Sequence, residues 1–290
     1  MITRILITLL LSSAFVMTQS LDEKQGYSND DNGRTKPDNE ESVNGEGFYP
    51  KAEGSFRIMS YNVGAFSKFM TDSTKEIAKM IKEAEADIVG LNELDSCNTR
   101  HNVNQVAQLA EELDWQWHFG RAMAYQGGAY GNGIVVPKDQ FIEEMYTVIL
   151  PKGSGSEQRS IAVIETGDYV LGAAHLDYTS EEAVMGQIAV VNNWVQTRYD
   201  MCRKPVFLIG DMNFTPSSNA IKALEEVWTR LSSTEPTIPV DSPQDCIDFI
   251  FHYRRSAPVK VTGTHTMTKF RTGDVTKASD HLPVYADVTF

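Results

Sequence analysis

Apolar and polar residues alternate in two different periods from residue 56 onward. Short runs of apolar or alternating residues indicate β-strands, and apolar residues spaced three or four apart indicate helices. Strands are predicted over 56–61, 88–91, 133–137, 160–165, 169–174, 206–209, 247–251, 259–264 and 283–288. Helices are predicted over 74–86, 103–113, 179–199 and 220–231. Strands alternate with helices and then follow one another near the end, a pattern typical of layered α/β proteins with mixed sheets.

The first 20 residues have the composition of an export signal. Arg4 precedes the mostly apolar stretch Ile5–Met17, whose 13 residues are fewer than the roughly 20 that span a bilayer. We therefore interpret 1–20 as a signal peptide, with an uncleaved membrane anchor as the alternative. The interpretation predicts a mature chain without a transmembrane segment that is secreted or periplasmic.

Residues 21–54 differ in composition from the rest of the chain. They contain nine acidic and four basic residues and few large apolar ones. Such a segment buries too little apolar surface to offset the entropy lost on ordering. We expect an acidic disordered linker here and one catalytic domain over 55–290, since neither a second linker nor an internal repeat is found.

Composition limits the classes of protein that fit. Hydrophobic residues make up 41% of the chain, which supports a substantial core and excludes a fibrous or wholly disordered protein. The net charge of −13 argues against tight binding of nucleic acid without a metal ion. The three cysteines, Cys97, Cys202 and Cys246, allow at most one intrachain disulfide, and whether Cys202 and Cys246 pair is open.

Polar residues stand at the ends of several apolar strands or inside them. Each alone has an ordinary structural explanation, such as a turn cap for an asparagine or a structural role for a histidine. A carboxylate inside an apolar strand, however, needs a partner. Because ligand sites of layered α/β folds lie at strand ends, the coincidence predicts one site. The residues are Asn62, Glu93, His175, Asp211, Asn213, Asp248, Asp280 and His281.

The motifs around these residues resemble those of the endonuclease/exonuclease/phosphatase family, whose fold is that of pancreatic DNase. They are SYNV (60–63), DIVGLNELD (87–95), GNGIVV (131–136), AHLDY (174–178), GDMNFTP (210–216), IDFIF (247–251) and SDHLPV (279–284). All occur in the family's order over 56–290, and GDMN and SDHLPV are the most specific. The resemblance implies an α/β four-layer sandwich of two mixed β-sheets flanked by helices (DNase I-like). It also implies metal-dependent hydrolysis of a phosphate ester.

The resemblance implies a metal site and a group that activates water. Glu93 would bind Mg²⁺ or Mn²⁺, with Asn62 nearby and Asp280 completing the metal or water network. His281 would activate water or stabilise negative charge, with its ring oriented by Asp248. Asp211 would position the nucleophile. Which of Asp211, Asp280 and His281 is the general base is open.

Three further residues would contact the phosphate. The resemblance assigns His175 and Asn213 as hydrogen-bond donors. Arg159 matches an arginine that some members place near the phosphate, and a surface salt bridge is the alternative. The sequence departs from the family pattern in Asn92-Glu93, where Gln-Glu is usual, and in Ala174, where a threonine is usual.

The function expected from these observations is Mg²⁺-dependent hydrolysis of a phosphodiester, as in a nuclease, by in-line attack of water. The partner would be a nucleic acid, a phospholipid headgroup or a small phosphodiester, and we expect a monomer. Scattered rather than clustered basic residues weaken the case for a nuclease. The alternatives are a sphingomyelinase-like phosphodiesterase of lipid headgroups and an inositol-type phosphomonoesterase. A catalytically inactive binding module is least favoured, because the full set of polar residues is present.

Overall fold

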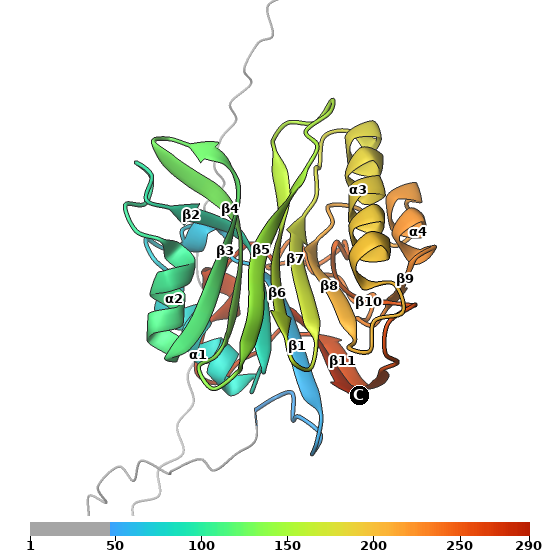
Figure 1. Cartoon of the computed structure of the whole chain (residues 1–290). Helices are drawn as coiled ribbons and strands as arrows, with labels where there is room; N and C mark the ends of the chain where they lie inside the picture. Colours follow the sequence, from blue (N-terminus) through green and yellow to red (C-terminus); the bar gives the residue numbers. More distant parts are fainter. Residues whose placement is uncertain (1–46) are drawn as a thin grey trace, which may run out of the picture. The chain divides into compact units, whose positions relative to one another are not determined.

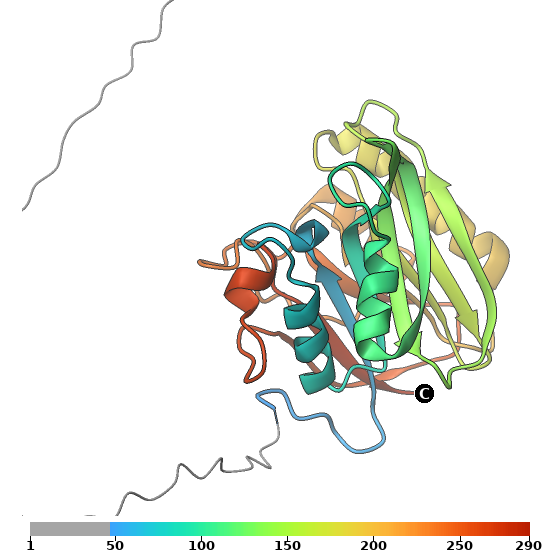
Figure 2. The same cartoon turned by 90° about the vertical axis from the view of Figure 1, so that its left-hand side faces the viewer.

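A computed structural model describes residues 47–290, so the predicted signal peptide and most of the predicted linker lie outside the described residues. Two six-stranded sheets pack face to face, and helices cover their outer faces (Figures 1 and 2). This is the predicted α/β sandwich of two mixed sheets. No helix within 47–290 combines the length and apolarity that crossing a membrane requires.

The first sheet has the strand order β11-β12-β1-β2-β4-β3. Its only parallel pair is β1 with β2, among the described residues. Helices α1 (Thr74–Glu83) and α2 (Gln105–Leu113) pack on its outer face. The strands are β1 (Phe56–Asn62), β2 (Ile88–Ser96), β3 (Trp115–Tyr125), β4 (Gly128–Pro137), β11 (Lys260–Thr266) and β12 (Val284–Thr289).

The second sheet has the order β5-β6-β7-β8-β10-β9, with β7 and β8 parallel. Helices α3 (Glu181–Tyr199) and α4 (Asn219–Glu225) pack on its outer face, and the short helices η1 (Gly64–Phe66) and α5 (Val275–Ala278) lie in connections. The strands are β5 (Ile142–Leu150), β6 (Arg159–Thr166), β7 (Val170–His175), β8 (Val206–Asp211), β9 (Trp228–Arg230) and β10 (Asp248–Tyr253).

Alternation along the strands separates the core into layers. In β1, Ile58 faces the opposite sheet, and its neighbour Met59 faces the helices. Ile88 and Val89 of β2 divide in the same way. Because successive side chains of a strand point to opposite faces, sheets buried on both sides need apolar residues at consecutive positions. The continuous apolar runs of the sequence reflect this double burial.

Every predicted strand and helix has a counterpart, with one correction. The helix predicted over 220–231 ends at Glu225, and Trp228–Arg230 form β9. Strands β3 and β5 were not predicted, and both are outermost strands of their sheets. Their residues are mostly partly exposed, so neither strand carries the apolar run of a central strand. The packed chain also begins before the predicted boundary at residue 55, because the Tyr49 ring packs against the first core layer.

The carboxamide of Asn92 joins the two sheets. It lies in β2 with no exposed surface, and its Nδ2 donates to the carbonyl oxygen of Ala174 in β7 (2.9 Å). Nδ2 also donates to Asn132 Oδ1 (3.0 Å), and Oδ1 accepts from the backbone N–H of Asp211 in β8 (2.9 Å). Gly210 precedes this contact with a φ of +135°, and a Cβ there would lie 1.8 Å from the Ala174 oxygen. The close approach therefore requires glycine.

We expect Asn92→Leu to destabilise the protein strongly. The substitution leaves three buried groups, on Asn132, Ala174 and Asp211, without their partner. The expected loss in the free energy of unfolding is roughly 2–4 kcal/mol, measured by urea unfolding followed by circular dichroism. Asn193→Leu on the exposed face of α3 is the matched control, and an equal loss in both variants would contradict the role of Asn92.

Candidate active site

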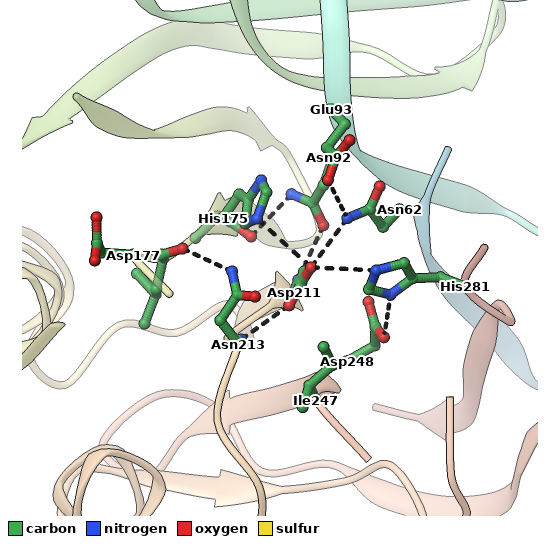
Figure 3. Close-up of polar contacts among 12 residues, drawn as sticks. Asn62, Asn92, Glu93, His175, Asp177, Asp211, Asn213, Ile247, Asp248 and His281 are labelled. Carbon is green, nitrogen blue, oxygen red and sulfur yellow. Dashed lines mark hydrogen bonds and ion pairs between the residues drawn. The ribbon is translucent and has the colours of Figure 1, made fainter. Parts of the chain in front are cut away.

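The predicted polar residues come together where several strands end, and Figure 3 labels all of them except Asp280. The parallel pairs β1/β2 and β7/β8 both end there, with Asn62 opposite Asn92 and His175 opposite Asp211. Strand β10 is antiparallel to β8 and begins with Asp248 opposite Asp211. The side chains are thus placed by strand register.

A β-bulge turns Glu93 toward the site. The pairing of β2 with β4 shifts between Leu91 and Leu94, and Glu93 has a φ of +60°. Such an irregularity redirects a side chain relative to the regular alternation of a strand. The half-buried Glu93 carboxylate accepts a hydrogen bond from Asn62 Nδ2 at Oε1 (3.1 Å) and lines a cleft.

The amide of Asn62 is held in one orientation. Its Oδ1 accepts from the backbone N–H of Gly64 (3.1 Å), and Nδ2 donates to Glu93 and to Asp211 Oδ2 (2.9 Å). Gly64 opens a left-handed turn in which Gly64, Ala65 and Phe66 have φ near +52°. Asn62 Nδ2 therefore donates to the carboxylates of Glu93 and Asp211. Asn62 was predicted to lie near a metal ion, and its Oδ1 accepts a hydrogen bond from Gly64 in this structure.

The Asp211 carboxylate lies at the centre of the site. Oδ2 is 3.5 Å from His175 Nε2 and 3.7 Å from His281 Nε2, and Oδ1 accepts from the backbone N–H of Asn213 (2.8 Å). Burial, reinforced by the charge of Asp248, raises the pKa of Asp211 to about 7. Hydrogen bonds from Asn62 Nδ2 and the Asn213 backbone N–H, together with the two imidazoles close by, compensate part of the cost of the charge of this buried carboxylate.

The predicted contact between Asp248 and His281 is present. Asp248 is fully buried, and its Oδ2 lies 2.9 Å from His281 Nδ1 while accepting from the Thr237 hydroxyl (2.6 Å). Burial alone would lower the pKa of His281, but the charges of Asp248 and Asp211 outweigh it and raise this pKa to about 10. His281 is therefore an imidazolium at neutral pH.

His175 is held in the neutral state by Arg159. Arg159 Nη1 donates to His175 Nδ1 (3.0 Å), so the ring hydrogen lies on Nε2, the atom nearer Asp211. Burial, together with the charge of Arg159, lowers the pKa of His175 well below its usual value. Arg159 is only 3% exposed, and its Nη2 also lies 3.4 Å from Glu157 Oε2, so Arg159 lies beside His175 and takes part in an ion pair that is buried on the arginine side.

Asn213 and Asp280 lie at the margin of this network. Asn213 has a φ of +58°, and its Nδ2 donates to the Leu176 carbonyl oxygen (2.9 Å). Asp280 pairs with Lys68, whose Nζ is 2.8 Å from Oδ2. Lys68 and Thr237 lie in connections without a motif, so the sequence predicts no role for either residue. Asn92 could have been recognised from the sequence, because its amide directly follows the apolar run 88–91.

A cleft of about 330 Å³ opens over these groups. Its floor and rim include Glu93, Arg159, His175, Asp211, Asn213 and His281. Atoms of Asp211, Asp248 and His281 lie within 4.8 Å of one another, a spacing that a metal ion can bridge. Asp248, however, is already engaged by Thr237 and His281. Glu93 instead presents a half-buried carboxylate to the cleft, and such an oxygen donor suits a hard divalent cation.

The sequence profile of the "Endonuclease/Exonuclease/phosphatase family" matches residues 59–281. The chain therefore belongs to this family, whose members are hydrolytic phosphoesterases. A search of curated proteins by sequence gave no match.

Solved structures share the fold at low sequence identity. A mannosyl-6-phosphatase from Bacteroides thetaiotaomicron is 20% identical with a TM-score of 0.66, over 81% of this chain and all (100%) of that one. A family protein from Bacteroides vulgatus is 19% identical with a TM-score of 0.64, over 81% of this chain and 99% of that one. A humanized TDP2 from D. rerio is 17% identical with a TM-score of 0.60, over 82% of this chain and 100% of that one.

We expect the pKa values of the two site histidines to be shifted in opposite directions, upward for His281 and downward for His175. In metal-free protein, ¹⁵N NMR of the imidazoles should show His281 protonated at pH 8 and His175 neutral at pH 5. Asp248→Asn should lower the pKa of His281 by at least about one unit, because burial is then opposed by the charge of Asp211 without that of Asp248. The exposed Asp139→Asn should leave it unchanged, and an unchanged His281 in Asp248→Asn would contradict the pairing.

Proposed function

We propose that this protein is a divalent-metal-dependent hydrolase of small phosphate esters that directs a water molecule in line at phosphorus. The observation that carries the proposal is the convergence of His175, His281 and Asn62 on the Asp211 carboxylate at the floor of a cleft. Glu93 lies at the edge of the same cleft. The arrangement supplies an acceptor for a proton of water and donors for phosphate oxygens.

The metal would be Mg²⁺ or Mn²⁺, held by Glu93 with Asp280 as a further oxygen donor. When bound, such an ion neutralises charge on a phosphate oxygen. The half-buried Glu93 carboxylate, which lines the cleft, is the oxygen donor that supports this addition.

The chain's own residues divide the remaining work. Asp211, whose carboxylate lies between the two imidazoles, orients the attacking water and accepts its proton. As the oxygen of water bonds to phosphorus, the bond from phosphorus to the ester oxygen breaks, and the leaving alcohol takes up a proton from the His281 imidazolium or from solvent. His175 donates from Nε2 to a phosphate oxygen, and Asn213 donates a second hydrogen bond. The His281 imidazolium, positioned by Asp248, stabilises the negative charge that develops on the phosphate.

Small esters fit the cleft better than polynucleotides do. A nucleic-acid groove tracks several phosphates with basic residues, yet among the lysines and arginines of residues 47–290 only Arg100 and Arg159 line this cleft. The net charge of −13 adds general repulsion of a polyanion. A mannosyl-6-phosphatase among the similar structures is consistent with a small ester. We therefore propose small phosphate esters as substrates. They include phosphomonoesters as well as the small phosphodiesters expected from the sequence.

The test measures release of p-nitrophenol from bis(p-nitrophenyl) phosphate and from p-nitrophenyl phosphate. Turnover of either ester should require Mg²⁺ or Mn²⁺ and stop with EDTA. Glu93→Gln, Asp211→Asn and His281→Ala should each lower kcat/KM by about 100-fold or more, the usual effect of removing a proton-transfer or charge-stabilising group. The preferred ester distinguishes monoesterase from diesterase.

Asp139→Asn is the control and should retain full activity, since its side chain is exposed and outside the cleft. Circular dichroism verifies that each variant is folded. Equal activity of wild type and Asp211→Asn, or turnover insensitive to EDTA, would rule out the proposal. A folded wild type that hydrolyses neither ester would favour the binding-module alternative.

A further inference from the structure

The wall of the cleft beside Glu93 carries a fixed arginine that the proposed chemistry does not use. Arg100 Nε and Nη2 donate to the two oxygens of Asp95 at 2.7 and 2.9 Å. The Asp95 side chain has no exposed surface, whereas that of Arg100 is 39% exposed. This bidentate pair fixes the plane of the guanidinium and leaves Nη1 without a partner within residues 47–290. Arg100 therefore presents an oriented donor.

The aromatic rings of this wall support Arg100. Its guanidinium carbon lies 5.1 Å from the centroid of the Tyr125 ring and 6.0 Å from that of Tyr130. The two rings are tilted by 51° relative to each other. A nucleobase stacks on a flat, accessible aromatic face. Here Arg100 lies over the rings of Tyr125 and Tyr130, so this wall offers hydrogen-bonding edges in preference to a stacking platform. The exposed aromatic ring of the cleft is that of Tyr178, so the adenosine 5′-monophosphate arm of the test below measures whether that ring binds a base.

Cations at and beside the cleft already have anionic partners. Arg100 is paired with Asp95, Arg159 Nη2 lies 3.4 Å from Glu157, and Lys68 is paired with Asp280. A second phosphate on the substrate needs a cation of its own, because desolvating an unpaired charge is costly. The pairing therefore favours a substrate whose remainder is uncharged.

The polar groups of this wall that have no role in the proposed chemistry include both hydrogen-bond donors and acceptors. The Tyr130 hydroxyl has no hydrogen-bond partner within residues 47–290, and burial raises its pKa well above the usual value. The phenol therefore stays neutral and both donates and accepts. Arg100 Nη1 donates, and the partly exposed Glu157 carboxylate accepts. Adjacent hydroxyl groups of a polyol, each a donor and an acceptor, match such a set.

We propose that Arg100 and Tyr130 form the leaving-group subsite and that this subsite takes an uncharged, sugar-type polyol esterified with one phosphate. The assignment rests on the proposed function and deepens it by naming the substrate class. Tyr130 contributes its hydroxyl, and Arg100 contributes a donor whose direction Asp95 fixes. Neither residue takes part in the chemical step.

The test compares kcat/KM with Mg²⁺ for glucose 6-phosphate, fructose 1,6-bisphosphate, adenosine 5′-monophosphate and p-nitrophenyl phosphate. Glucose 6-phosphate should exceed the bisphosphate and the nucleotide by at least about tenfold, the effect of one well-placed hydrogen bond or unpaired charge. Tyr130→Phe should lower kcat/KM for glucose 6-phosphate about five- to tenfold more than it lowers kcat/KM for p-nitrophenyl phosphate, whose leaving group carries no hydroxyl groups. Tyr49→Phe, outside the cleft, is the matched control.

Arg100→Lys provides a second variant, because it keeps a cation for buried Asp95 while removing the planar donor. Its selectivity for glucose 6-phosphate should fall as in Tyr130→Phe. A preference of the wild type for the bisphosphate or nucleotide would overturn the subsite. So would equal losses on both substrates in Tyr130→Phe.

Calorimetric binding to Asp211→Asn protein with Mg²⁺ separates the two proposals. Binding of glucose 6-phosphate that Tyr130→Phe weakens, in a protein whose wild type hydrolyses no ester, would support the subsite and overturn the proposed function. Hydrolysis of p-nitrophenyl esters without binding or turnover of glucose 6-phosphate would overturn the subsite alone.

Discussion

The active geometry depends on one buried carboxamide. Asn92 extends from β2 of the first sheet and binds backbone groups of β7 and β8 in the second. Those groups belong to Ala174, which precedes His175, and to Asp211 itself. Asn62 and Glu93 come from the first sheet, so the distances among them, His175 and Asp211 follow from how the sheets meet. The Asn92 amide thus provides hydrogen-bond partners for two buried backbone groups, and the same hydrogen bonds fix the position of one sheet relative to the other.

Electrostatics organises the site around this contact. Asp248 and Asp211 lie on adjacent strands at paired positions, and their mutual repulsion is relieved by the imidazolium of His281. His175 lies as close to Asp211 yet stays neutral, because burial lowers its pKa and the charge of Arg159, which faces its other nitrogen, lowers this pKa further. Two histidines near one carboxylate therefore hold different protonation states, set by the partner that each ring has on its far side.

The sequence predicted the parts of this arrangement that strand periodicity controls. Each of these central strands is apolar and ends in a polar residue. The prediction that Asn62, His175 and Asp211 lie at one edge of the sheets is therefore confirmed. Partners that come from elsewhere in the chain left no local signal: Thr237 reaches Asp248 from a loop, and Lys68 reaches Asp280 across more than two hundred residues. Edge strands β3 and β5 were missed because partial exposure removes the apolar run.

The division of the site between two sheets has a mechanical consequence. Each sheet is stiff along its own hydrogen-bonded ladder, but the apolar layer between them resists sliding only through packing and through polar links such as Asn92. A small shear of one sheet past the other would separate Asn62 from Asp211 without unfolding either sheet. Loosening of this interface would therefore disturb the site while both sheets remain folded.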